Sequence, residues 1–112
     1  MRNLLLLTAL MVSALPVKAD DRELGNRAHV IGALAAAECG VRTELFTRKK
    51  ADELISTYIN ENPQLQSAYS WATTSLKAQT ALQVLDPYMN AQCDGFSLSE
   101  DESERLIGPY LD

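Results

Sequence analysis

The stretch of sequence that decides the fold is residues 62–93, which read NPQLQSAYSWATTSLKAQTALQVLDPYMNAQC. It opens with Asn62 and Pro63, a helix start signal, because a proline at the first helical position lacks an N–H group that would have no partner there anyway. It closes on Cys93, and Cys39 is the only other cysteine in the chain. We therefore expect this stretch to form a helical scaffold and to carry one end of a disulfide.

The apolar face of this scaffold changes side midway. When residues are placed at 100° steps, the early apolar residues share one face, and the later ones share a different face together with Trp71. The early set is Leu65, Ala68, Tyr69, Ala72 and Leu76, and the later set is Ala78, Leu82, Leu85 and Met89. The pattern predicts either a straight helix that contacts two partners or a bent helix around one core, with a kink or break at Asp86-Pro87. It also predicts that Trp71 packs under the C-terminal segment.

A first helix is expected over residues 22–39, where apolar side chains recur at three- and four-residue steps and Gly40 follows as a helix stop. The connection after it is expected to tuck Leu45 and Phe46 inward. Along the first helix runs a stripe of small residues that would let another backbone approach closely, namely Ala28, Gly32 and Ala36.

Two further helices are marked by their caps. Thr47 predicts the cap of a helix over residues 48–61, and Ser99 with Glu102 has the spacing of a capping box that opens a last helix. The inner face of the first of these two helices is expected to consist of Ala51, Leu54, Ile55 and Tyr58. Because no alternating β pattern of useful length occurs, the fold class is all-α, a small bundle of four to five helices stapled by one disulfide.

Residues 1–19 have the pattern of a secretory signal peptide. Residues 4–15 are almost purely apolar, and Val17-Lys18-Ala19 places small residues at the usual cleavage spacing. A membrane anchor would need about 20 apolar residues, whereas this run stops at Pro16. We expect cleavage after Ala19, a periplasmic or secreted protein with no stable membrane insertion, and a single helical domain over residues 20–112.

The two cysteines are expected to form an intramolecular disulfide, because an exported chain enters an oxidising compartment. Cys39 and Cys93 are each followed within two residues by a glycine, and both are expected to end helical segments. The bond would then join two helix C-termini. Neither cysteine lies in a Cys-x-x-Cys pair or at a helix N-terminus that would stabilise a thiolate, which argues against redox catalysis.

The charge of the expected mature chain excludes one class of partner. Loss of Arg2 and Lys18 with the signal peptide reduces the 10 basic residues to 8, against 15 acidic residues, so the net charge is near −7. Neutralising phosphates requires clustered Lys or Arg, and the only basic cluster is residues 48–50. No binding to nucleic acid is expected.

The sequence offers few candidates for catalytic or metal-binding residues, and none of them has the partners that such a site requires. His29 is the only histidine and has no nearby partner of the kind that acid–base catalysis requires. The acidic residues 100–104 fit the first turn of a helix, where the helix dipole favours negative charge. A pattern like a calcium loop, from Asn90 through Asp94 to Glu102, departs too far from that motif for enough carboxylates to converge. We expect no catalytic residue, no metal site and no cofactor.

The candidates for partner binding are aromatic. Trp71, Tyr69 and Tyr88 are chosen because aromatic residues are overused at binding surfaces. Tyr58 and Tyr110 complete the set that could line a ligand groove. Packing inside a small helical domain is the competing interpretation for all of them. Because Trp71 lies off the early apolar face, a role for it in partner binding remains an alternative.

A signal peptide, four or so helices and a pair of cysteines form a layout that resembles that of periplasmic acid-stress chaperones. The resemblance concerns the layout, and no residue roles follow from it. The function we expect is binding without catalysis, by a monomer or weak homodimer whose partner is an envelope protein or a small ligand. One alternative is a holdase-like envelope stress chaperone that exposes apolar surface at low pH. The other is a small hydrolase, which would need a base and a nucleophile that the sequence does not show.

Overall fold

The computed structural model describes residues 20–112, and the predicted signal peptide with its cleavage after Ala19 lies outside them. The described part contains five α-helices: α2 (Asp21–Arg42), α3 (Arg48–Glu61), α4 (Gln66–Thr74), α5 (Leu76–Leu85) and α6 (Glu100–Ile107). Three short 3-10 turns join them: η1 (Pro63–Leu65), η2 (Asp86–Tyr88) and η3 (Gly108–Tyr110). Between residues 20 and 112 the only β pairing is an isolated bridge between Met89 and Phe96. The predicted all-α bundle of four to five helices with one disulfide is confirmed.

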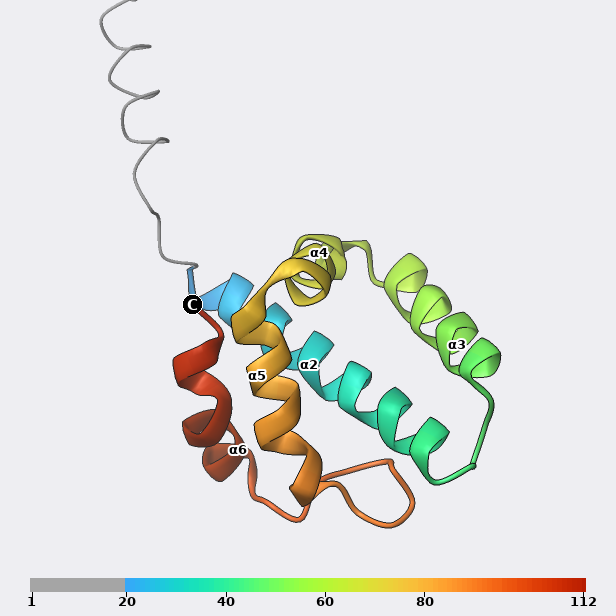
Figure 1. Cartoon of the computed structure of the whole chain (residues 1–112). Coiled ribbons are helices and arrows are strands. Elements are labelled where there is room, and N and C mark those ends of the chain that lie inside the picture. The colour runs from blue at the N-terminus through green and yellow to red at the C-terminus, as the bar shows by residue number, and fades with distance from the viewer. Residues whose placement is uncertain (1–19) are drawn as a thin grey trace, which may run out of the picture.

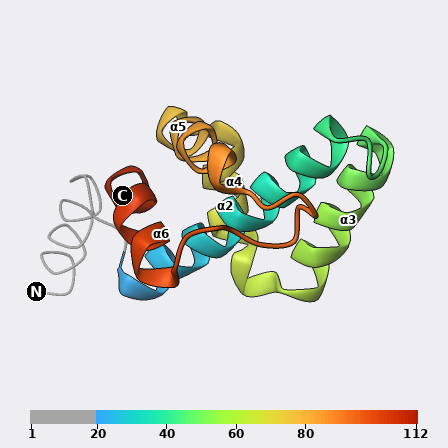
Figure 2. The same ribbon diagram turned by 90° about the horizontal axis from the view of Figure 1, so that it is seen from below.

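Helix α2 is the centre of the bundle. Helices α3, α4 and α5 all pack against it, and α6 packs against α5 (Figure 1). Seen from below, α3 and α6 lie toward opposite ends of α2 (Figure 2). The buried positions of α2 accordingly point in several directions around its axis, because a helix enclosed by neighbours has no wide solvent face. They are Val30, Ile31, Ala35, Ala37, Cys39 and Gly40.

The predicted scaffold is not one helix but two. Ser75 adopts an extended conformation (φ −98°, ψ 133°), ends α4 and caps α5, with its hydroxyl accepting a hydrogen bond from the backbone N–H of Ala78 at 3.4 Å. The expectation of a straight or bent helix is therefore wrong at this point, and the change of apolar face is produced by a change of chain direction. Leu76, assigned to the early face, lies just after the break and is 85% exposed. The predicted break at Asp86-Pro87 is confirmed, since α5 ends at Leu85.

The disulfide between Cys39 and Cys93 is confirmed, with a Cα–Cα distance of 5.6 Å. The expectation that both cysteines end helices is wrong. Cys39 lies inside α2, and Cys93 lies in the loop after η2, where it has a positive φ of 60°. Few non-glycine residues adopt this left-handed conformation, which must be held by its surroundings.

The loop that carries Cys93, residues 89–96, is held by its own hydrogen bonds. The side chains of Asn90 and Asp94 are joined at 2.8 Å, and the Asn90 side-chain oxygen accepts from the Asp94 backbone N–H at 3.1 Å. The Asn90 backbone N–H donates to the Gly95 carbonyl at 2.9 Å. In the sequence, Asn90 and Asp94 formed part of a pattern like a calcium loop. In the structure these two side chains bond to each other and close the loop. We call residues 89–96 the cysteine loop.

Gly40 does not stop the first helix, which continues to Arg42. A Cβ atom built on Gly40 would lie 2.0 Å from Cζ of Phe46, so the ring of Phe46 occupies the space that a side chain would need. Phe46 is thus tucked inward as predicted, whereas Leu45 is 55% exposed and the prediction for it is wrong. The glycine makes room for a close approach rather than for a turn.

Gly32, in the stripe of small residues on α2, faces the ring of Phe96 and not a second backbone. A Cβ atom on Gly32 would meet Cε2 of Phe96 at 3.8 Å, which is ordinary van der Waals contact. Phe96 closes the cysteine loop, so the loop reaches α2 at Gly32 and again at Cys39, seven residues and about two helical turns away. At Gly32 the neighbour is therefore a side chain of the cysteine loop rather than a second backbone.

The caps of α3 and α6 are as predicted. The Thr47 side chain accepts from the Lys50 backbone N–H at 3.1 Å, and Ser99 forms a reciprocal capping box with Glu102. On the inner face of α3, Ala51 is buried, but Leu54 is 44% exposed and Ile59 is buried in its place. Helix α3 packs mainly on α2 and η1, and this packing leaves Leu54 partly in solvent.

Gly32 and Gly40, two of the three glycines of α2, provide a matched pair for mutation. Gly40→Ala should destabilise the protein by about 1–3 kcal/mol, because the added methyl group displaces the Phe46 ring from α2. Gly32→Ala should be neutral or stabilise by up to about 1 kcal/mol, because the methyl group fits against Phe96 and alanine favours helix. Urea denaturation of both variants measures the difference. Equal stability of the two variants would contradict the account of Gly40.

Candidate functional site

The candidate site is an open cleft over α2. Two hollows, of about 340 Å³ and about 500 Å³, meet at Leu34 and Glu38 of α2, which line both. The first lies between α2, α3 and the start of α4, and the second between α2, α4 and α5. Hollows of a few hundred Å³ are of the size that ligands or anchoring side chains fill. We call the two together the α2 cleft.

Four half-buried apolar side chains define the α2 cleft, one from each of four helices. They are Leu34 of α2, Ile55 of α3, Tyr69 of α4 and Leu82 of α5. Beneath them lie buried small residues of the core, Ala35, Ala37, Ala51 and Ala72. Because alanines bring the helices close at the floor, the larger side chains are left standing around the opening with part of their apolar surface in solvent.

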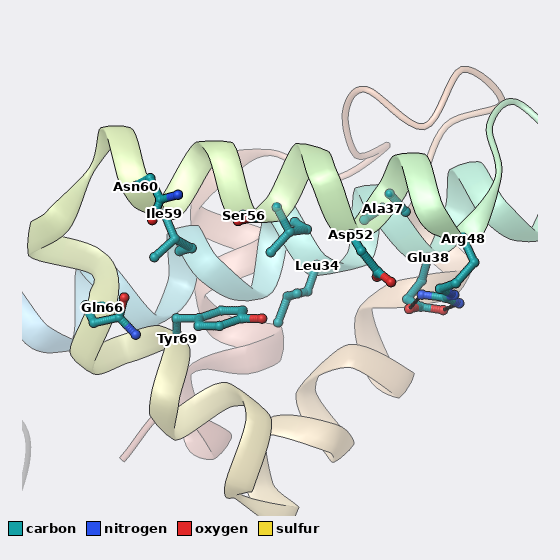
Figure 3. Close-up of a pocket in the computed structure, with 12 residues that line it drawn as sticks. Leu34, Ala37, Glu38, Arg48, Asp52, Ser56, Ile59, Asn60, Gln66 and Tyr69 are labelled. Atoms are coloured by element: carbon teal, nitrogen blue, oxygen red, sulfur yellow. Dashed lines mark hydrogen bonds and ion pairs between the residues drawn. The ribbon is translucent and has the colours of Figure 1, made fainter.

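The two ends of the first hollow differ in character (Figure 3). At one end the amide side chains of Asn60 and Gln66 face the opening, and the ring of Tyr69 points toward Leu34. At the other end the guanidinium group of Arg48 meets the carboxylate of Glu38. The cleft therefore has an apolar middle between an uncharged polar end and a charged end.

The charged end is a row of ion pairs that crosses three elements. Arg48 of α3 donates to both carboxylate oxygens of Glu38, at 2.6 and 2.9 Å. Arg42, one turn further along α2, donates to Asp86 of η2 at 2.5 Å. These pairs are about half exposed, so each contributes little to stability. Their consequence is geometric, since they fix the positions of α3 and η2 relative to the end of α2.

The Arg48 guanidinium, which donates hydrogen bonds to Glu38, holds the pKa of that carboxyl below its ordinary value of 4.5. Partial burial works in the opposite direction, and the positive charges of Arg48 and then Arg42 add to the lowering. Because the pKa is lower in the folded state, the ion pair favours folding above pH 4.5 and loses that contribution as the pH falls through the folded pKa.

The structure does not bring the three aromatic candidates into one site. Tyr69 lines the α2 cleft, whereas Tyr88 is 38% exposed beside Leu98 and Leu106. Trp71 is half-buried under the guanidinium of Arg27, whose central carbon lies 4.6 Å from the ring centre. Their roles in binding stay a prediction.

The surroundings of Trp71 connect it to the end of the chain. Arg27, which lies over the Trp71 ring, donates a hydrogen bond to the Leu111 carbonyl at 2.5 Å. It also pairs with Glu23 at 3.4 Å. Trp71 is thus linked to the C-terminal segment through Arg27, and its direct packing under that segment stays a prediction.

The remaining sequence candidates are scattered. His29 is exposed on α2, and no group of three or more His, Cys, Asp or Glu side chains within residues 20–112 is placed to hold a metal ion. Within the same range, no helix combines the length and the apolar character required to cross a membrane.

Sequence reasoning missed the α2 cleft because its apolar residues resemble core residues. Ile55 and Leu82 were assigned to apolar faces, and Leu34 was assigned to no face at all. The only available signal was the pair Leu34 and Glu38, a leucine and an acidic residue four apart on an otherwise alanine-rich helix.

No protein-family model matches this chain, and no curated protein or solved structure is significantly similar to it. The function must therefore be argued from the α2 cleft itself.

The ion pair at the charged end can be tested by titration. In Arg48→Met the pKa of Glu38 should rise toward its ordinary value, because the hydrogen bonds from Arg48 are the largest cause of the lowering. In the control Arg42→Met the rise should be smaller, because Arg42 acts only through its more distant charge. Carbon NMR of the side-chain carboxyl measures both. A Glu38 pKa that is the same in the parent and in Arg48→Met would contradict the bidentate pair.

Proposed function

We propose that this chain is an exported, non-catalytic binding protein that receives an apolar group of its partner in the α2 cleft. The observation that carries the proposal is the position of four half-buried apolar side chains from four helices around two adjoining hollows. Leu34, Ile55 and Tyr69 line the first hollow, and Leu34 and Leu82 line the second. Filling the cleft would remove their remaining apolar surface from water, which contributes about 25 cal/mol per Å² buried.

Export is part of the proposal and is supported by the disulfide. A buried disulfide that closes 54 residue steps forms and persists in an oxidising compartment, and such bonds are common in small exported domains. A periplasmic or secreted protein, monomeric or weakly dimeric, fits this chemistry.

Binding rather than catalysis is supported by the groups that line the cleft. Four of its five charged residues form ion pairs with one another at one end, Glu38 with Arg48 and Asp86 with Arg42. Neither hollow is lined by histidine or cysteine, so the lining offers no nucleophile with an adjacent base of the usual kind.

The proposal is tested with Nile red, an uncharged dye that fluoresces in apolar surroundings. At pH 7 the oxidised protein over residues 20–112 should bind the dye, and Leu82→Glu should weaken binding at least about tenfold, because a charge in the cleft must be desolvated. Leu76→Glu is the matched control, since it makes the same change on the same helix at a position that is 85% exposed. It should leave dye binding unchanged.

Two results would contradict this function. One is dye binding that survives both Leu82→Glu and Ile55→Glu in proteins that keep their helical circular dichroism. The other is dye binding that appears only near pH 3, together with loss of fixed tertiary packing, which would favour the holdase-like stress chaperone instead.

A further inference from the structure

The α2 cleft restricts the backbone conformation of a peptide that could enter it. A bound peptide must satisfy its own N–H and C=O groups when it leaves water. The middle of the cleft is made of side chains on four helices, whose backbone groups are already paired within those helices, and neither hollow is lined by the one β bridge that the described residues contain. No strand edge is therefore available for β-augmentation at this place. An α-helix is the peptide conformation that brings its own hydrogen bonds.

The length of the cleft fits about three helical turns. Its lining on α3 extends from Arg48 to Asn60, twelve residue steps along that helix. At 1.5 Å per residue this is about 18 Å, the length of a helix of about twelve residues. The residues that line this hollow together, Leu34, Ile55 and Tyr69, would contact one apolar face of such a helix, with anchors spaced at three and four residues. Leu82 lines the adjoining hollow.

The charges of the lining favour a basic partner. Three acidic residues, Glu38, Asp52 and Asp86, line the cleft with two basic ones, Arg42 and Arg48. Arg48 donates hydrogen bonds to Glu38, and Arg42 donates one to Asp86. The Asp52 side chain forms no hydrogen bond or close ion pair within residues 20–112, although its charge acts on Arg48, one turn earlier on α3. The Asp52 side chain extends from α3 on the side where Leu34 and Tyr69 lie (Figure 3). Asp52 is thus the carboxylate of the lining that accepts no hydrogen bond from an arginine and can accept one from a basic partner.

The net negative charge of the chain also favours a basic partner, and it acts at longer range than the residues of the cleft. With residues 1–19 removed, 8 basic residues remain against 15 acidic ones, a net charge near −7. A second copy of this chain would be repelled, whereas a basic helix would be attracted and would bind faster at low salt.

From these observations we infer the chemistry of the partner: a basic amphipathic α-helix of about three turns, whose apolar face enters the α2 cleft and whose basic residue meets Asp52. The inference rests on the proposed function, because it names what that cleft binds.

The experiment uses two stapled helical peptides of fourteen residues that share one leucine and alanine face and differ only in having Lys or Glu on the polar face. Stapling makes both helical before they bind, so helix propensity does not enter the comparison. Each carries the same fluorophore, and fluorescence anisotropy measures its affinity for the oxidised protein over residues 20–112. The Lys peptide should bind at least about tenfold more tightly at 50 mM salt, and the difference should shrink at 500 mM salt as screening shortens the reach of the charges.

The matched variants locate the preference. Asp52→Lys should reduce the ratio of the two affinities to about threefold or less, because it reverses the charge at the cleft. Glu53→Lys makes the same change of net charge on the next residue of α3, which lines neither hollow, and should leave the ratio close to that of the parent. Equal reduction by both variants would overturn the role of Asp52, because the preference would then belong to the net charge alone.

The remaining outcomes separate this inference from the proposed function. If the Glu peptide binds as tightly as the Lys peptide, and Leu82→Glu abolishes its binding, the cleft receives a helix but the inferred basic partner is wrong. If Nile red occupies the cleft and neither peptide binds, the helical partner is wrong and the proposed function stands. If neither the dye nor either peptide binds, both are wrong.

Discussion

The bond between Cys39 and Cys93 is the constraint on which the rest of the structure depends. It attaches the cysteine loop to α2, the helix against which α3, α4 and α5 all pack. The short turn η2 joins α5 to this loop, so the same bond holds the chain just beyond the α5 wall of the α2 cleft. Beside it, Arg42 and Asp86 form a second connection between α2 and η2. Because this ion pair is exposed and screened by salt, the covalent bond is the connection that persists.

A domain of this size needs such a constraint because its core is small. Chains of about 90 residues bury a modest share of their surface, and many of the core residues here are alanines. Small side chains allow the helices of this bundle to approach closely, but they contribute little apolar area. The same feature creates the α2 cleft: where alanines form the floor, Leu34, Ile55, Tyr69 and Leu82 are only half covered. Helix α3 adds to the opening because it packs on α2 and η1 rather than on α5.

Features set by neighbouring residues could be predicted from the sequence, and features set by distant contacts could not. The caps of Thr47 and Ser99 were predicted correctly, because a cap depends on a side chain and on backbone groups three residues away. Gly40 was misinterpreted because its role depends on Phe46 folding back over α2. Ser75 carries a cap signal, but within a stretch of helical periodicity nothing local shows that the chain turns there. The α2 cleft was missed for a related reason, since a leucine covered by a helix and one left beside a gap have the same local sequence.

The central claim is that the Cys39 and Cys93 bond maintains the fold and with it the cleft, and unfolding of the protein without that bond tests it most directly. The free energy of unfolding in urea should be compared between the oxidised parent over residues 20–112 and a Cys39→Ala/Cys93→Ala variant. A disulfide that closes 54 residue steps predicts a loss of about 4 kcal/mol. Since small domains are stable by only about 5–15 kcal/mol, the variant should lose a large share of its stability, and a parent near the lower end of that range would leave it barely stable. A variant within about 1 kcal/mol of the parent would contradict the account.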